Sequence, residues 1–224
     1  MKITAVIPIR KGSQRVVGKN LRSFAGSNLL EIKIENLKKV KSIDEIIVNT
    51  DSEEAIEIAK KLNVSFHRRE VYYASSSCTG SEFFQHLGAV TDTDVFAYCP
   101  VTSPFVKVET MEKAIEMFKT DTEHDCLSTV SLVKEFMWLD GKTINYDPQN
   151  APNSQNLPDI EALNFGFTLV HKADLVKNRN IIGKNPMFIR TSDVEAIDID
   201  TPLDFFVAEQ IYIRTVLETK GLLD

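Results

Sequence analysis

Residues 3–20 read ITAVIPIRKGSQRVVGKN, and this stretch decides the predicted fold. An apolar run over residues 3–9 predicts a buried strand. A loop follows it that contains Arg10, Lys11, Gly12, Ser13, Lys19 and Asn20. Such a loop is suited to polyphosphate, because backbone N–H groups face the anion and basic side chains neutralise its charge. The alternative is an ordinary strand followed by a solvated basic loop.

Alternating strand and helix patterns predict an α/β fold with a doubly wound, mostly parallel sheet. After the first strand, the apolar spacing predicts a helix over 29–40, a strand over 45–49, a helix to about residue 62 and a strand over 64–67. Further helices are expected over 81–90, 108–118 and 202–217, and further strands over 94–99, 127–133, 165–171 and 187–190. In such sheets ligands bind at the carboxyl ends of the strands, where the basic loop would lie.

Composition narrows the class of protein. Of the 224 residues, 43% are hydrophobic and 26% are charged, which is typical of a globular chain with a sizeable core. The net charge of −6 argues against a general nucleic-acid binder, so the basic loop favours a small anionic ligand. The sequence has no membrane-length apolar run and no signal-peptide pattern, so we expect a cytoplasmic protein without a membrane partner. The cysteines form no CxxC pair and the histidines no HExxH pattern, so no zinc site is predicted.

Residues 134–163 interrupt the alternation of strands and helices. They mix aromatic residues with proline, glycine and asparagine, which indicates a hairpin and an irregular excursion. Connections of this length usually have a function. We therefore expect a single nucleotide-binding domain over 1–224, with an excursion over 134–163 that serves dimer contacts or acts as a lid. The alternative is a long surface loop.

A carboxylate pair near the end of the chain forms a second candidate element. In an extended segment residues two apart point to one side, so Asp198 and Asp200 would face one ligand while Ile197 and Ile199 turn to the core. Paired carboxylates suit an oxygen-loving cation such as Mg²⁺ shared with phosphate oxygens. The alternative is an acidic strand end in which Asp200 or Thr201 caps the next helix.

Together, the basic loop and the carboxylate pair predict a site for a nucleoside triphosphate and magnesium, and hence phosphoryl or nucleotidyl transfer. Two common nucleotide-binding motifs are excluded by spacing. Five residues separate Gly12 from Gly18, and Asn20 stands where a Walker A loop has serine or threonine. No GxGxxG run is present either.

The chain resembles the cytidylyltransferases that activate acidic 2-keto sugars, the CMP-sialic acid synthetase family. Residues 7–21, IPIRKGSQRVVGKNL, resemble the N-terminal signature of that family, and residues 196–209, AIDIDTPLDFFVAE, resemble its metal-binding region. The resemblance covers about residues 2–209. It implies a nucleotide-diphospho-sugar transferase fold, a homodimer, and attack of the sugar's anomeric hydroxyl on the α-phosphate of CTP with release of pyrophosphate.

The resemblance also implies roles for single residues. The nucleotide-binding set comprises Arg10, Lys11, Gly12, Ser13, Lys19, Asn20, Arg69, Thr79 and Ser81. Arg10 and Ser13 would contact the triphosphate, and Arg69 with Thr79 or Ser81 would lie near cytosine and ribose. Lys19, Arg10 and Asp200 form the catalytic set, in which Lys19 would stabilise charge during transfer. Asp198 and Asp200 would bind Mg²⁺, and one of them would help to deprotonate the attacking hydroxyl.

The sugar-side motifs depart from the family pattern. Residues 99–106, CPVTSPFV, lack the glutamine and arginine of QPTSPLR, and residues 154–158, SQNLP, lack the arginine of RQQLP. Residues 164–168, NFGFT, replace a PNGAIY-like run. The acceptor is therefore expected to be sialic acid or a related nonulosonic acid. Two alternatives remain: a sugar-1-phosphate nucleotidyltransferase, and a non-catalytic nucleotide-sugar-binding subunit that would have little reason to keep both charge sets.

Overall fold

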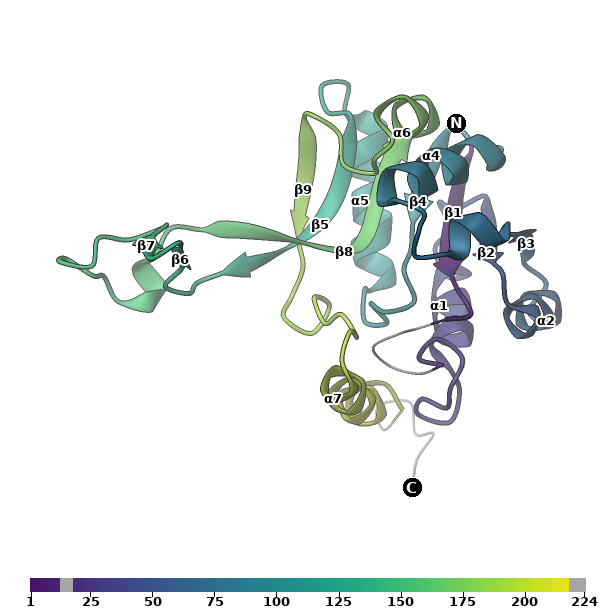
Figure 1. Cartoon of the computed structure of the whole chain (residues 1–224), viewed down its shortest axis with the longest axis horizontal. Coiled ribbons are helices and arrows are strands. Elements are labelled where there is room, and N and C mark those ends of the chain that lie inside the picture. The colour runs from purple at the N-terminus through teal and green to yellow at the C-terminus, as the bar shows by residue number, and fades with distance from the viewer. Residues whose placement is uncertain (13–17, 218–224) are drawn as a thin grey trace.

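A seven-stranded sheet in the order β3-β2-β1-β4-β8-β5-β9 forms the centre of the molecule (Figure 1). This computed structural model describes residues 1–12 and 18–217. The strands are β1 (Ile3–Ile9), β2 (Glu45–Thr50), β3 (Ser65–Arg68), β4 (Val95–Tyr98), β5 (Cys126–Val133), β8 (Ile160–His171) and β9 (Pro186–Arg190). All neighbours are parallel except at β8, which runs antiparallel to β4 and β5. The predicted mostly parallel α/β sheet is confirmed.

Helices cover both faces of this sheet. They are α1 (Leu29–Leu37), α2 (Glu53–Lys61), α3 (Val71–Ala74), α4 (Gly80–Val90), α5 (Val108–Thr120), α6 (Lys172–Asn178) and α7 (Pro202–Tyr212), which continues as a π-helix over Ile213–Leu217. Successive residues of β1 point to opposite faces. Ile7 accordingly packs in the cluster that contains Leu30 of α1, and Val6 packs with Leu87 of α4 and Leu175 of α6. The sheet is therefore buried on both sides, as a doubly wound fold requires.

Several boundaries differ from the sequence prediction. The first helix ends at Leu37 rather than at residue 40, and the last α-helix ends at Tyr212. The strand expected over 165–171 begins at Ile160, because residues 160–163 also pair with β5. The extension of β8 depends on pairing with a strand that is distant in the sequence, which local patterns do not reveal. None of the helices within the described ranges has the length and apolar character needed to cross a bilayer.

The predicted excursion is an arm that projects from the sheet (Figure 1). The ends of β5 and β8 stay paired up to Val133 and Ile160, beyond which β6 (Trp138–Leu139) and β7 (Lys142–Thr143) form a small hairpin. Asp159 at its base lies 2.5 Å from Lys134 Nζ and 3.0 Å from Arg190 Nη1. The hairpin is confirmed, whereas the single-domain assignment and the use of the arm stay predictions.

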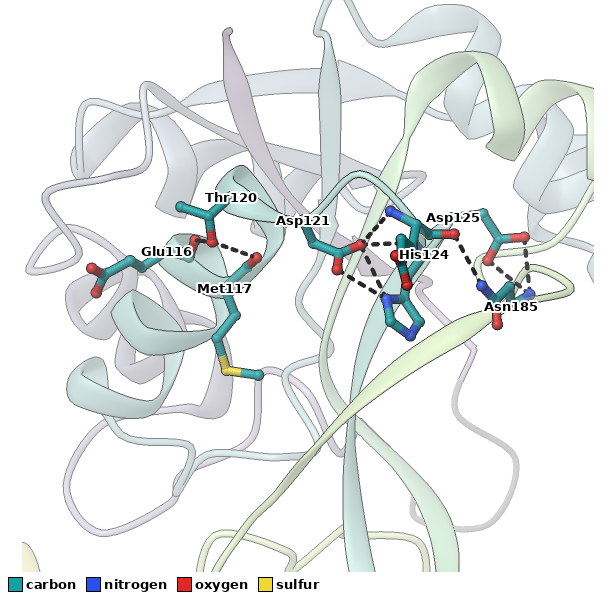
Figure 2. A network of polar contacts seen from close by, with 8 residues as sticks. Glu116, Met117, Thr120, Asp121, His124, Asp125 and Asn185 are labelled. Carbon is teal, nitrogen blue, oxygen red and sulfur yellow. Dashed lines mark hydrogen bonds and ion pairs between the residues drawn. The ribbon is translucent and has the colours of Figure 1, made fainter.

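Asp125 fixes the edge strand β9 beside β5 (Figure 2). Its carboxylate accepts hydrogen bonds from the backbone N–H groups of Lys184, at 2.6 Å, and Asn185, at 3.2 Å. The Asn185 side chain donates in return to the Glu123 carbonyl at 2.9 Å. Asp121 accepts from the N–H of His124 at 2.7 Å, which turns the chain from α5 into β5. These bonds set the register of the two strands at their amino ends.

We expect Gly183→Ala to break this connection. A Cβ at residue 183 would lie 2.2 Å from the carboxyl carbon of Asp125, so the carboxylate would have to leave its N–H donors. Loss of these bonds should lower the free energy of unfolding, measured by urea denaturation, by about 1–3 kcal/mol. Gly80→Ala is the matched control, because nothing lies within 4 Å of its added Cβ. An equal change in both variants would contradict this account.

Candidate active site

Seven of the predicted site residues line adjoining cavities at the carboxyl ends of the central strands, namely Arg10, Lys11, Lys19, Asn20, Arg69, Asp198 and Asp200. The basic cavity, of about 580 Å³, is lined by Arg10, Lys19, Asn20 and Arg69 among others. The acidic cavity, of about 320 Å³, is lined by Asp198 and Asp200. Both share a wall formed by Tyr98, Pro100 and Thr102. A third cavity, of about 690 Å³, shares Arg10 and Asn20 with the basic one and includes Lys11.

The loop after β1 is shaped by its two ends. Lys11 donates its backbone N–H to Asp51 Oδ1 at 2.8 Å, which ties the start of the loop to the end of β2. Gly18 has φ +64°, a conformation that glycine adopts without steric cost. Its carbonyl accepts from the N–H groups of Leu21 at 3.0 Å and Arg22 at 2.9 Å, so the chain turns back toward the sheet. Gly12 is exposed, and Ser13 lies outside the described residues.

Lys19 joins the two predicted halves of the site. Its side chain is buried, and its ammonium donates to the Ile199 carbonyl and lies 3.5 Å from Asp200 Oδ1. The N–H of Ile199 donates in turn to the Thr102 carbonyl at 2.9 Å. The loops after β1 and β4 and the segment before α7 are therefore held together at one point.

Thr201, rather than Asp200, caps helix α7. Its hydroxyl accepts from the Asp204 N–H at 3.2 Å, and Asp204 Oδ2 accepts from the N–H groups of Thr201 at 2.7 Å and Asp200 at 3.1 Å. Hydrogen bonds from Thr201 hold the pKa of Asp204 below its usual value. This capping box fixes the backbone of residue 200 while its carboxylate faces Lys19 and the acidic cavity.

The carboxylate pair fits a metal ion that is shared with a ligand. Within the described residues no group of three or more histidine, cysteine, aspartate or glutamate side chains is placed to hold a metal. Asp198 and Asp200 nevertheless line one cavity, and Mg²⁺ commonly takes only one or two protein carboxylates when substrate phosphates complete its coordination. The residues present fit Mg²⁺ that arrives with a phosphate ligand.

Arg69 is held rigidly at the opposite side of the basic cavity. Its Nε donates to Asn49 Oδ1 at 2.6 Å, its Nη2 donates to the Asn49 carbonyl at 2.8 Å, and its guanidinium lies 4.6 Å from the centre of the Phe83 ring. Burial lowers the pKa of Arg69 to about 10, so it keeps its charge at neutral pH. The amide of Asn49 also contacts His67 Nδ1 at 2.9 Å. Arg69 therefore presents a fixed cation to a ligand.

Thr79 and Ser81 are not brought into the basic cavity. Thr79 is the N-cap of α4, where its hydroxyl accepts from the Glu82 N–H at 3.2 Å and donates to Glu82 Oε2 at 2.7 Å. Ser81 follows in the first turn of the same helix and is exposed. The hydroxyl of Thr79 thus serves the helix end, and a nucleotide contact of either residue stays a prediction.

Sequence reasoning missed Lys33, Asn49 and Tyr98. Lys33 is fully buried in α1, where its ammonium donates to the Ser103 carbonyl at 2.6 Å and burial lowers its pKa to about 8. Burial raises the pKa of Tyr98 to about 12, so its phenol stays neutral. The burial of Lys33 could have been predicted from the sequence, because the residue lies four positions from both Leu29 and Leu37 on the apolar face of its helix.

Comparison with known proteins shows the family to which the chain is similar. A family model described as cytidylyltransferase matches residues 4–151. The CMP-N,N'-diacetyllegionaminic acid synthase of Legionella pneumophila is 28% identical over 225 residues, covering 94% of this chain and 96% of that protein. The N-acylneuraminate cytidylyltransferase of Oncorhynchus mykiss is 26% identical over 95% of this chain, and the chain spans 50% of its length.

A solved structure shows the same fold. The structure of CMP:2-keto-3-deoxy-manno-octonic acid synthetase complexed with CTP superposes with a TM-score of 0.71 at 12% sequence identity. The match covers 96% of this chain and all of the other, so it extends well past the region of the family model. Because the family model matches more than half of the chain, the chain belongs to the cytidylyltransferase family.

Proposed function

We propose that this protein transfers CMP from CTP to the anomeric hydroxyl of an acidic 2-keto sugar of the nonulosonic acid class, with release of pyrophosphate. The observation that carries the proposal is the contact of Lys19 with Ile199 and Asp200, because it joins the basic cavity to the carboxylate pair. The names of the two relatives, which act on legionaminic and acylneuraminic acids, support the choice of acceptor.

The charges of the two cavities suit this reaction. Arg10 and Lys19 neutralise the triphosphate, and Asn20 contacts the nucleotide at the junction of two cavities. Arg69 contacts the nucleoside part of the ligand. Because its hydrogen bonds to Asn49 already hold the side chain, it loses little conformational entropy when the ligand binds. Lys19 stabilises the charge that develops as the bond between the α-phosphorus and the departing pyrophosphate breaks.

The acceptor enters from the acidic cavity. Its hydroxyl gives its proton to one of the two carboxylates, Asp198 or Asp200. The resulting oxygen forms the new bond to the α-phosphorus as the bond to pyrophosphate breaks. Asp198 and Asp200 would also hold Mg²⁺, which when bound supplies positive charge to the phosphate oxygens. Lys19, bonded to the Ile199 carbonyl, keeps these carboxylates at the edge of the basic cavity.

Release of pyrophosphate tests the proposal as a whole. The protein is incubated with Mg²⁺, each of the four nucleoside triphosphates, and a panel of keto-sugar acids and sugar 1-phosphates. We expect turnover only with CTP and a keto-sugar acid. Turnover only with a sugar phosphate, or nucleotide binding without turnover across the whole panel, would contradict the proposed reaction.

We expect Asp200→Asn to reduce kcat by about 100-fold or more, by analogy with the loss of other groups that stabilise developing charge. Asp193→Asn is the matched control, because it removes the same charge from an exposed position in the preceding loop. Binding of Mn²⁺ in the presence of CTP, followed by electron paramagnetic resonance, should weaken only in Asp200→Asn. Full activity or unchanged Mn²⁺ binding in that variant would show that Asp200 does not hold the metal.

The arm is the surface that we propose for a homodimer in the cytoplasm. Phe136, Trp138, Leu139 and Ile144 are 43–64% exposed on it, which is unusual for large apolar side chains that sit close together in sequence. Light scattering should give twice the chain mass of 25.3 kDa. Trp138→Glu should shift the protein toward the monomer, whereas Val71→Glu, at an exposed residue of α3, should not. A monomeric wild-type protein would rule out this use of the arm.

A further inference from the structure

One wall of the acidic cavity is apolar. Asp198 and Asp200 lie on one side of the cavity, and the apolar part of its lining comes from Phe84, Tyr98, Pro100, Phe165 and Ile181. No lysine or arginine is among the described residues that line it. Phe165 is 36% exposed, so its ring is accessible to a ligand. This cavity therefore offers carboxylates, the neutral polar side chains of Thr102, Asn164 and Asn180, and an apolar surface, but no cation for an acidic group.

Phe165 has a backbone conformation that an aromatic residue rarely adopts. Its φ is +52°, in the left-handed region, where glycine and asparagine are favoured and a bulky residue is an outlier. The residue lies in an irregular part of β8, where residues 164–167 stand opposite the single residue Thr129 of β5 and the pairing register shifts between Ser128 and Val130. Such irregularities re-aim side chains and are common beside active sites.

The neighbours of Phe165 hold this conformation in place. Asn164 accepts from Thr129 Oγ1 at 2.6 Å, and its amide donates to Ser131 Oγ at 3.0 Å and Thr191 Oγ1 at 2.9 Å. On the other side, a Cβ at Gly166 would lie 2.8 Å from Val106 Cγ2. The backbone is thus fixed before and after residue 165. A glycine there would relieve the strain, so the aromatic side chain is present at a conformational cost.

The chemical structure of the acceptor determines which part of it lies against the Phe165 ring. In a cyclic 2-keto sugar acid the carboxylate and the anomeric hydroxyl are bonded to the same carbon. When that hydroxyl attacks the α-phosphate, the acidic end must therefore lie toward the basic cavity, near Arg10 and Lys19. The far end of the sugar then occupies the acidic cavity, beyond Asp198 and Asp200 and against the apolar wall.

We propose that Phe165 is a specificity-determining residue, whose ring contacts the far end of the acceptor and favours sugar acids with acylamido groups there over sugar acids with hydroxyl groups alone. This inference rests on the proposed function and extends it to the substituents of the acceptor. An acetyl methyl group gains free energy by leaving water for an aromatic surface, whereas a hydroxyl group placed against the same ring would lose its hydrogen bonds with water and gain none there.

The test compares two acceptors in the wild-type protein and in Phe165→Gly. The acceptors are N,N'-diacetyllegionaminic acid, with two acetamido groups, and 2-keto-3-deoxy-manno-octonic acid, with none. We expect the wild type to favour the diacetylated acid, and Phe165→Gly to lower the ratio of the two kcat/KM values about 10-fold, the usual range for apolar discrimination. The KM for CTP should stay the same. Phe165→Tyr keeps the ring and should keep most of the ratio.

Stability separates this role from a structural one. Because glycine fits the left-handed conformation, Phe165→Gly should melt at the same temperature as the wild type or higher. If Phe165→Gly keeps the wild-type ratio of the two kcat/KM values, the assignment to Phe165 is wrong and the proposed function still stands. A lower Tm together with an equal fall in kcat/KM for both acids would likewise overturn the assignment, because it would show a structural role. Failure of the wild-type protein to use any keto-sugar acid would overturn the proposed function together with this inference.

Discussion

The hydrogen bond from the buried ammonium of Lys19 to the Ile199 carbonyl is the interaction on which the site depends. It joins residues 180 positions apart, and Asp200 lies beside the same ammonium. A buried cation is costly without partners, so the loop after β1 and the segment before α7 hold each other in place. The basic cavity therefore lies directly beside the two carboxylates, Asp198 and Asp200. A basic cavity beside a carboxylate pair suits a triphosphate that carries a divalent cation better than it suits a triphosphate or a cation alone.

The loop after β4 completes this framework. Its Thr102 carbonyl accepts from Ile199, and its Ser103 carbonyl accepts from the ammonium of Lys33 below. Burial depresses the pKa of Lys33, which shows that the charge is disfavoured at this position. The loop forms the shared wall of the basic and acidic cavities, so its placement sets how far the two reacting groups lie apart. We interpret the unfavourable burial of the Lys33 charge as the free-energy cost of holding the loop after β4 in place.

The sequence predicted those parts of the site that follow from strand ends and short spacings. Arg10 and Lys19 were expected at the edge of the sheet because their loop follows a predicted strand, whereas Arg69 was assigned to the site by the family resemblance. All three line the basic cavity. The positions of Asn49 and Tyr98 were not predicted, because their importance comes from contacts with residues of other strands. The antiparallel direction of β8 was not predicted for the same reason, since a buried strand has the same apolar pattern in either direction.

In the proposed reaction, the two halves of the site would select their ligands by different means. Arg69 is bonded to Asn49 through two nitrogens, and a site built from fixed hydrogen bonds rejects ligands that leave its groups unpaired. The proposed acceptor side would rely on apolar contact, which discriminates more weakly, so the position of each ring would matter more. Strand β8 carries both Phe165 and, from Ile160, the base of the arm. In the proposed dimer, contacts made by the arm would act on the same strand that positions the ring, so dimer formation and acceptor choice would be coupled through the irregularity at residue 165.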